Sequence, residues 1–132
     1  IENYIEIKEK YFKNIKLESE TDSEVLAHLI NLYAKDKNIL DAVHSALKEV
    51  KGSYAIAVLD KNNSNEIIVA RHGSPLIIGV GEDSNFIASD AHALIEYTNQ
   101  FIYLDDGDMA SVSSSEINIF DKDKKSVNRE IK

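Results

Sequence analysis

The stretch Lys51-Gly52-Ser53-Tyr54-Ala55-Ile56-Ala57-Val58-Leu59 marks the point at which the hydrophobic period of the chain changes. From Ser53 to Leu59, apolar side chains occupy both odd and even positions, which is typical of a strand buried on both faces. Before this stretch the apolar residues recur at helical spacing, and after it short apolar runs alternate with turn residues. The stretch therefore divides the chain into a helical first part and a β-rich second part.

Three amphipathic helices are predicted in the first part, over residues 2–13, about 22–35 and about 39–50. Thr21-Asp22-Ser23-Glu24 matches a capping box at the start of the second helix. Thr21 is the expected N-cap, and Glu24 is expected to accept from the backbone N–H of Thr21. Gly52 is expected to cap the end of the third helix.

The second part predicts short strands separated by turn residues, with residues 61–65 as the first turn. The short connections favour antiparallel pairing, and the fold class is α+β, with helices packed against a mainly antiparallel sheet. Because residues 53–59 need cover on both faces, we expect a second sheet against them. A helical turn over 90–96, capped by Asp90, interrupts the strands. The expected strands are residues 53–59, 66–71, 76–80, 85–88, 101–104, 108–112 and 116–120.

Size and composition limit the classes of function. The 132 residues suit one domain with a real core, and the net charge of −8 disfavours nucleic acid or a membrane surface as partner. No cysteine is present, which excludes disulfides, thiolate metal ligands and a cysteine nucleophile within this sequence and is compatible with the cytoplasm. A helical pattern already runs from Ile1 onward, so we expect an excised portion of a larger functional unit.

Asp22 is the candidate site residue, and the residues alone leave two interpretations open. A carboxylate in the first turn of a helix is favoured by the helix dipole, so capping explains the acids of this stretch. Alternatively, the capped helix holds Asp22 rigidly toward the ammonium group of a ligand. Capping boxes are common, and the pattern by itself favours the first interpretation.

Other reactive side chains form no complete catalytic pattern. The four histidines, His28, His44, His72 and His92, show no metal-binding spacing, so neither a metal nor a cofactor is expected. Ser45 and Lys48 match a Ser-x-x-Lys pattern, but they fall inside a predicted helix without companion motifs. Gly73-Ser74-Pro75 is interpreted as a structural turn, in which Gly73 takes a positive φ.

Several ordered stretches together resemble one family. The chain is similar to the glutaminase domain of the glutamine–fructose-6-phosphate aminotransferases (isomerizing), which are class II glutamine amidotransferases, over essentially its whole length. The stretches that carry this resemblance are Ile1-Glu2-Asn3-Tyr4, residues 19–29, Gly52-Ser53-Tyr54-Ala55, residues 71–76, residues 86–90, Asp106-Gly107-Asp108 and Ile119-Phe120-Asp121.

The resemblance implies a portion of the four-layer αββα N-terminal-nucleophile hydrolase sandwich. It implies hydrolysis of the side-chain amide of glutamine, with ammonia passing to a sugar-isomerase domain of the same protein that makes glucosamine 6-phosphate from fructose 6-phosphate. The family nucleophile is an N-terminal cysteine, and an Asn-Gly pair stabilises the oxyanion. By the resemblance Asp22 matches the acid that binds the α-amino group of glutamine.

Residues 1–132 are therefore interpreted as the C-terminal portion of a glutaminase domain. The resemblance places the nucleophile, the Asn-Gly pair and the carboxylate-binding segment before Ile1, so we expect no catalytic residue and no glutaminase activity in this chain alone. Self-association through uncovered apolar surface, as on Ile56 or Val58, is also expected. Two alternatives remain: another class II amidotransferase such as amidophosphoribosyltransferase, although residues 73–76 favour the aminotransferase, or a non-enzymatic acidic interaction module.

Overall fold

The computed structural model describes residues 1–132 and separates into two compact units. We call residues 1–52 the helical unit and residues 53–132 the sheet unit. The boundary falls between Gly52 and Ser53, where the change of hydrophobic period predicts it. None of the helices has the length and apolar character needed to cross a membrane.

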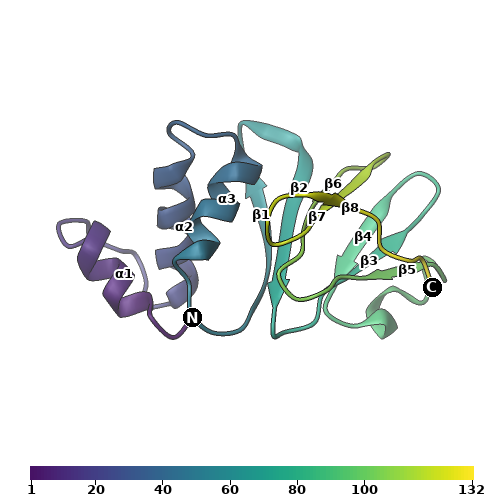
Figure 1. Cartoon of the computed structure of the whole chain (residues 1–132), viewed down its shortest axis with the longest axis horizontal. Helices are drawn as coiled ribbons and strands as arrows, with labels where there is room; N and C mark the ends of the chain where they lie inside the picture. Colours follow the sequence, from purple (N-terminus) through teal and green to yellow (C-terminus); the bar gives the residue numbers. More distant parts are fainter. The chain divides into compact units, whose positions relative to one another are not determined.

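The helical unit contains the three predicted helices, α1 (Tyr4–Tyr11), α2 (Asp22–Tyr33) and α3 (Ile39–Lys48), shown in Figure 1. The third helix is shorter than predicted, because it ends at Lys48 with Glu49 as its C-cap. The prediction that Gly52 caps this helix is therefore wrong. The core of the unit consists of Ile7, Phe12, Val25, Leu26, Leu29, Ile30, Ala42, Val43, Ala46 and Leu47, which are all buried.

One carboxylate joins the three helices of this unit. Glu49, just beyond α3, accepts a hydrogen bond of 2.6 Å from the hydroxyl of Tyr11 in α1 and another from the hydroxyl of Tyr33 in α2. The hydrogen bond to Glu49 raises the pKa of each tyrosine, so both hydroxyls stay protonated donors. Lys10 adds an ion pair to the same carboxylate at 3.6 Å. The cluster depends on tertiary contacts, and nothing in the local sequence indicates it.

The sheet unit contains two antiparallel sheets (Figure 1). The order in the larger one is β1-β2-β6-β7-β8 and in the smaller one β4-β3-β5. All seven predicted strands are confirmed, whereas β8 was not predicted and β2 begins three residues earlier than expected, which shortens the preceding turn. The bounds are β1 (Tyr54–Asp60), β2 (Asn63–His72), β3 (Ile77–Val80), β4 (Asn85–Ala88), β5 (Phe101–Tyr103), β6 (Met109–Val112), β7 (Ile117–Phe120) and β8 (Ser126–Val127).

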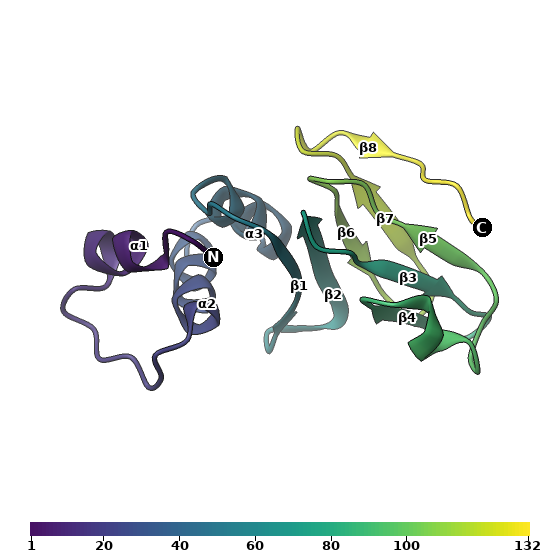
Figure 2. The same ribbon diagram turned by 90° about the horizontal axis from the view of Figure 1, so that it is seen from below.

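The two sheets enclose an apolar core, which confirms the expected second sheet (Figure 2). Its buried members come from both sheets: Val69, Leu76, Ile78, Ile102, Leu104, Ala110, Val112 and Ile119. The prediction that residues 53–59 are buried on both faces is wrong. Strand β1 lies at the edge of its sheet, only Ala55 borders this core, and the Leu59 side chain is 75% exposed. The core is centred on β2 and β6 instead.

A short helical turn, η1 (Ala91–Leu94), follows β4, and Asp90 is its N-cap as predicted. The Asp90 carboxylate accepts from the backbone N–H of His92 at 2.9 Å. This hydrogen bond is the first cause of the lowered pKa of Asp90. The local sequence was sufficient here because a cap depends on residues that are neighbours along the chain.

A buried ion pair fastens the end of the chain to the sheet unit. The Asp108 side chain is 1% exposed and accepts two hydrogen bonds of 2.8 Å from the guanidinium of Arg129. The backbone N–H of Asp105 donates to the same carboxylate at 2.8 Å. Because the Asp108 carboxylate is buried and bound by both ends of the guanidinium, loss of Arg129 would leave a buried charge without its ion-pair partner.

We predict that Asp108→Asn lowers the free energy of unfolding by about 1.5–3 kcal/mol, because the charged hydrogen bonds between Asp108 and Arg129 are lost while Arg129 keeps its ion pair with Asp105. Urea denaturation followed by circular dichroism measures this change. The exposed Asp123 provides the matched control, and Asp123→Asn should change the value by less than about 0.5 kcal/mol. Equal effects of the two substitutions would show that the ion pair is not structural.

Candidate functional site

Asp22 is the first residue of helix α2, and Thr21 is the N-cap. The Asp22 side chain is 39% exposed, and its Oδ2 accepts from the α-ammonium of Ile1 at 2.7 Å. This hydrogen bond to the ammonium lowers the pKa of the Asp22 carboxyl, which is therefore ionised at neutral pH. A carboxylate at this place is also favoured by the positive end of the helix dipole. The residue singled out by the sequence is thus a partly exposed carboxylate at the positive end of a helix.

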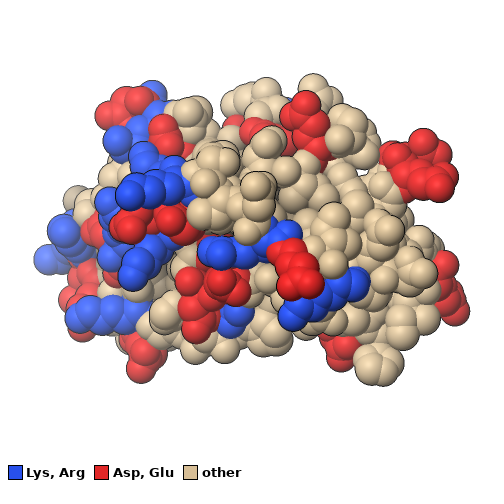
Figure 3. Space-filling view, turned by 45° about the vertical axis from the view of Figure 1, so that its right-hand side comes forward, with Lys and Arg blue, Asp and Glu red and all other residues tan.

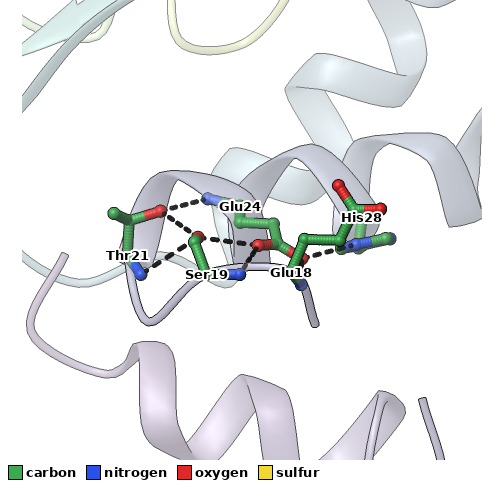
Figure 4. A network of polar contacts seen from close by, with 5 residues as sticks. All are labelled: Glu18, Ser19, Thr21, Glu24 and His28. Atoms are coloured by element: carbon green, nitrogen blue, oxygen red, sulfur yellow. Dashed lines mark hydrogen bonds and ion pairs between the residues drawn. The ribbon is translucent and has the colours of Figure 1, made fainter. Parts of the chain in front are cut away.

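The loop before α2 is held by a network of polar contacts, drawn in Figure 4. The Thr21 hydroxyl accepts from the backbone N–H of Glu24 at 3.3 Å, which confirms Thr21 as the N-cap. The Glu24 carboxylate accepts from the backbone N–H of Glu18 at 2.9 Å and of Ser19 at 2.6 Å. The Ser19 hydroxyl donates to it at 2.7 Å.

The prediction of a reciprocal capping box is wrong in its second half. The backbone N–H of Thr21 donates to the Ser19 hydroxyl at 3.3 Å, whereas the Glu24 carboxylate binds residues 18 and 19. The loop folds back over the start of the helix. The backbone N–H groups of Glu18 and Ser19 therefore bind the Glu24 carboxylate in place of the backbone N–H of Thr21. The loop and the first turn of α2 therefore form one hydrogen-bonded unit, which restricts where the Asp22 carboxylate can lie.

The hydrogen bond from Ser19, and then that from the backbone of Glu18, lower the pKa of Glu24 to about 2. His28, one turn further along α2, lies 3.2 Å from the same carboxylate. Sequence reasoning assigned no role to Ser19 in this network. The signal that could have found it is the pattern Ser-x-Thr ahead of an N-cap, since side chains of this type bind nearby backbone groups.

In the sheet unit, the polar side chains near the predicted turn at Gly73 serve the structure. Gly73 has a φ of +79°, as predicted, and a Cβ there would lie 2.2 Å from the Ser53 hydroxyl. The Arg71 guanidinium donates to the carbonyl oxygens of Ser74 and Leu104 and to the Asp106 carboxylate. Asp106 also accepts from the backbone N–H of Gly73, the first cause of its lowered pKa.

The remaining reactive residues lie apart. His28 and His44 are in the helical unit, whereas His72 and His92 are in the sheet unit, and no group of three or more His, Asp or Glu is placed to hold a metal ion. Ser45 lies within α3, as predicted.

Two open hollows lie in the sheet unit, with volumes of about 530 and 400 Å³. The first is lined by residues 80–84 together with Phe86 and residues 97–100. The second borders the exposed His92 and Arg71, whose guanidinium donates three hydrogen bonds to the chain itself. Neither hollow contains a buried polar atom that lacks a partner.

Comparison with known proteins gives the family. A family model described as a glutamine amidotransferase domain matches residues 1–96, which include Asp22 and the whole capped loop. The chain belongs to this family. This membership decides against a purely non-enzymatic acidic module as the leading interpretation. The acidic residues also lie among basic ones on the face in Figure 3 and do not gather into one patch there.

Relatives named glutamine–fructose-6-phosphate aminotransferase [isomerizing] match nearly the whole chain. The protein from Fusobacterium nucleatum is 43% identical over 134 residues, and that from Bacteroides thetaiotaomicron is 46% identical over 137; each comparison covers 100% of this chain. The protein from Aquifex aeolicus is 44% identical and covers 99% of it. The chain spans 22% of the length of each of these relatives and is homologous to their glutaminase domain.

A solved structure shows the same fold. Glutamine phosphoribosylpyrophosphate amidotransferase from B. subtilis, complexed with ADP and GMP, superposes with a TM-score of 0.74 at 24% identity. The match covers 94% of this chain and 28% of that one. The chain therefore has the α+β fold of a portion of the N-terminal-nucleophile amidotransferase domain, as the resemblance implied.

We predict that the amide protons of Glu18 and Ser19 report the ionisation of Glu24, to which both donate. Because the pKa of Glu24 is lowered from 4.5 to about 2, its stabilising effect is complete above pH 4.5 and is lost as the pH falls toward 2. NMR chemical shifts of the two amides should therefore change little between pH 7 and about 3.5. Glu24→Gln should remove the step at lower pH, and a midpoint near 4.5 would contradict the network.

Proposed function

We propose that this chain is the C-terminal portion of a glutaminase domain, which hydrolyses glutamine with water to glutamate and ammonia. In the whole protein the ammonia would then convert fructose 6-phosphate to glucosamine 6-phosphate in a sugar-isomerase domain. Identity of 41–46% to aminotransferases across most or all of the chain supports this proposal. Because a sugar phosphate is charged and does not cross membranes freely, the cytoplasm is the proposed compartment.

Within this reaction, we assign the α-ammonium of glutamine to Asp22. The observation that carries the assignment is the place of Asp22 in the capped first turn of α2, with a side chain that is 39% exposed, inside the segment that the glutamine amidotransferase family model matches. A charged acceptor and a charged donor form a strong, short hydrogen bond, which suits recognition of an amino acid.

The surroundings of Asp22 support this role in two ways. An aspartate carboxyl is ionised at neutral pH, so Asp22 can attract a cation. The cap formed by Thr21 and the loop held by Glu24 fix the start of α2, so little side-chain freedom is lost when a ligand binds. The capping and binding interpretations of this stretch are therefore compatible, because the cap positions the carboxylate.

A phosphoribosyl acceptor for the ammonia is the alternative. The similarity to the B. subtilis enzyme, at 24% identity, supports the common fold and does not favour this acceptor. Incubating the full-length protein with glutamine and either fructose 6-phosphate or phosphoribosyl pyrophosphate distinguishes the two, since only the true acceptor is aminated.

We predict that Asp22→Asn in the full-length protein raises KM for glutamine by about 10- to 100-fold, because a charged hydrogen bond contributes about 1.5–3 kcal/mol. The rate supported by externally added ammonium, which bypasses glutamine binding, should stay unchanged. Steady-state assays with the two nitrogen sources measure both values.

Glu20→Gln is the matched control, because Glu20 is an exposed acid two residues from Asp22 whose loss changes the net charge equally. It should leave KM for glutamine within about twofold. An unchanged KM in Asp22→Asn would remove Asp22 from the binding site.

The 132-residue chain alone is proposed to be inactive as a glutaminase, since it holds no cysteine to act as the family nucleophile.

The 132-residue chain is also proposed to self-associate. Ile56 and Val58 are only half-buried, and β1 lies at the edge of its sheet with Leu59 exposed. Edge strands present unpaired backbone groups that can pair with a second chain.

We predict that light scattering of this chain gives a mass above 14.8 kDa and that Leu59→Lys shifts it toward the monomer. A lysine on an edge strand opposes pairing through charge repulsion. Ile95→Lys serves as the control, because Ile95 is also exposed but lies outside β1. A monomeric unsubstituted chain would contradict self-association.

A further inference from the structure

Ser19, Thr21 and Glu24 form a closed ring of hydrogen bonds at the start of α2 (Figure 4). The backbone N–H of Glu24 donates to the Thr21 hydroxyl at 3.3 Å. The hydroxyls of Thr21 and Ser19 lie 2.9 Å apart, and the Ser19 hydroxyl lies 2.7 Å from the Glu24 carboxylate. We call these three contacts the Ser19 ring, because it leaves Glu24 at the backbone and returns to it at the side chain.

The direction of each hydrogen bond in the ring follows from the charge of Glu24. An ionised carboxylate can only accept, so the Ser19 hydroxyl uses its one proton to donate to Glu24. The contact between the two hydroxyls then requires that Thr21 donates and Ser19 accepts. The Thr21 oxygen in turn accepts from the backbone N–H of Glu24. All three bonds therefore run in the same sense, an arrangement in which each bond polarises the next.

Ser19 takes over the part that a reciprocal capping box would give to Glu24. In such a box, the acid accepts directly from the backbone N–H of the N-cap residue. Here the backbone N–H of Thr21 donates to the Ser19 hydroxyl at 3.3 Å, and that hydroxyl donates to the Glu24 carboxylate. Loss of the Ser19 hydroxyl would therefore remove its contacts with the backbone of Thr21, the hydroxyl of Thr21 and the carboxylate of Glu24 together.

The ring holds the chain on both sides of Asp22 and leaves the Asp22 carboxylate out. Thr21 precedes Asp22, and Glu24 follows it by two residues. An aspartate that capped the helix itself would use its carboxylate on backbone N–H groups. Because Thr21 is the N-cap, the partly exposed Asp22 carboxylate is not needed for that purpose. The ring thus fixes the main chain at Asp22 and leaves its side chain to a ligand.

We propose that Ser19 is a positioning residue for glutamine binding, because its hydroxyl closes the ring that fixes the main chain on both sides of Asp22. This inference rests on the proposed function. Ser19 is assigned no contact with glutamine and acts through Thr21 and Glu24. Without the ring, the main chain at Asp22 could shift, and a misplacement of about 1 Å can cost up to 100-fold in an enzyme site.

The test uses the full-length protein and compares Ser19→Ala with Ser23→Ala. Ser19→Ala opens the ring and should raise KM for glutamine by about tenfold, while the rate with added ammonium stays unchanged. Ser23→Ala removes a hydroxyl from an exposed serine that is next to Asp22 but outside the ring, so KM should stay within about twofold. Ser19→Thr keeps the hydroxyl at an exposed position and should restore the original KM.

Two further variants separate positioning from general loss of stability. Thr21→Val opens the same ring at another atom with little change of side-chain shape, so it should raise KM as Ser19→Ala does. Asn38→Ala removes the cap of α3, where the Asn38 side chain accepts from the backbone N–H of Asp41 at 2.9 Å. It should lower the midpoint of thermal unfolding and leave KM unchanged.

The inference is overturned if Ser19→Ala and Thr21→Val both leave KM unchanged while Asp22→Asn raises it. It is also overturned if Ser19→Thr raises KM as much as Ser19→Ala, since the hydroxyl is then not the group responsible. A rise of KM in Asn38→Ala equal to that in Ser19→Ala would have the same consequence. If Asp22→Asn is silent too, the proposed function itself has failed, so the two failures are distinguishable.

Discussion

The capped start of α2 is the constraint on which the candidate site depends, because it sets where the Asp22 carboxylate lies. A carboxylate on a flexible loop would lose conformational freedom on binding a small cation, and much of the interaction energy would be lost with it. Here the carboxylate begins a helix whose first turn is tied to the preceding loop through Thr21 and Glu24. Capping therefore fixes the position of the Asp22 carboxylate as well as stabilising the helix.

The same unit shows how one polar residue connects several elements of the fold. The Glu49 carboxylate holds α1 and α2 through two tyrosine hydroxyls, while its backbone carbonyl accepts from Asn3. One residue thus takes part both in joining the helices and in holding residues 1–3. Polar networks of this kind are effective because each donor has an acceptor, and no buried side-chain polar atom in the protein lacks a partner.

The sheet unit uses its charged residues differently. Arg71 and Arg129 donate to carbonyl and carboxylate oxygens of the turn between β5 and β6, so they brace that turn and are not free for a ligand. The apolar core between the two sheets needs these connections because short strands have few backbone hydrogen bonds of their own. An arginine or an acid in a sequence motif is thus no guide to chemistry until its contacts are known.

Much of the fold followed from local patterns. The change of period at Gly52, the three helices and seven strands, and the caps at Thr21 and Asp90 all depend on residues close together in the chain. The errors were of another kind. Each wrong prediction depends on which other segment of the chain packs against the residue concerned. These predictions were the capping role of Gly52, the second half of the capping box and the burial of β1 on both faces. The two-residue β8 carries too few residues for a recognisable pattern.

The sequence by itself determined the two-part α+β organisation and, through its motifs, the amidotransferase resemblance and the choice of Asp22. Hydrophobic period and capping chemistry are local, so they can be read from neighbouring residues. Only the tertiary structure decided that Asn3 reaches residues 49 and 51 and that Glu49 joins the helices. These contacts connect residues between 16 and 48 positions apart, and such pairing is set by how the helices pack.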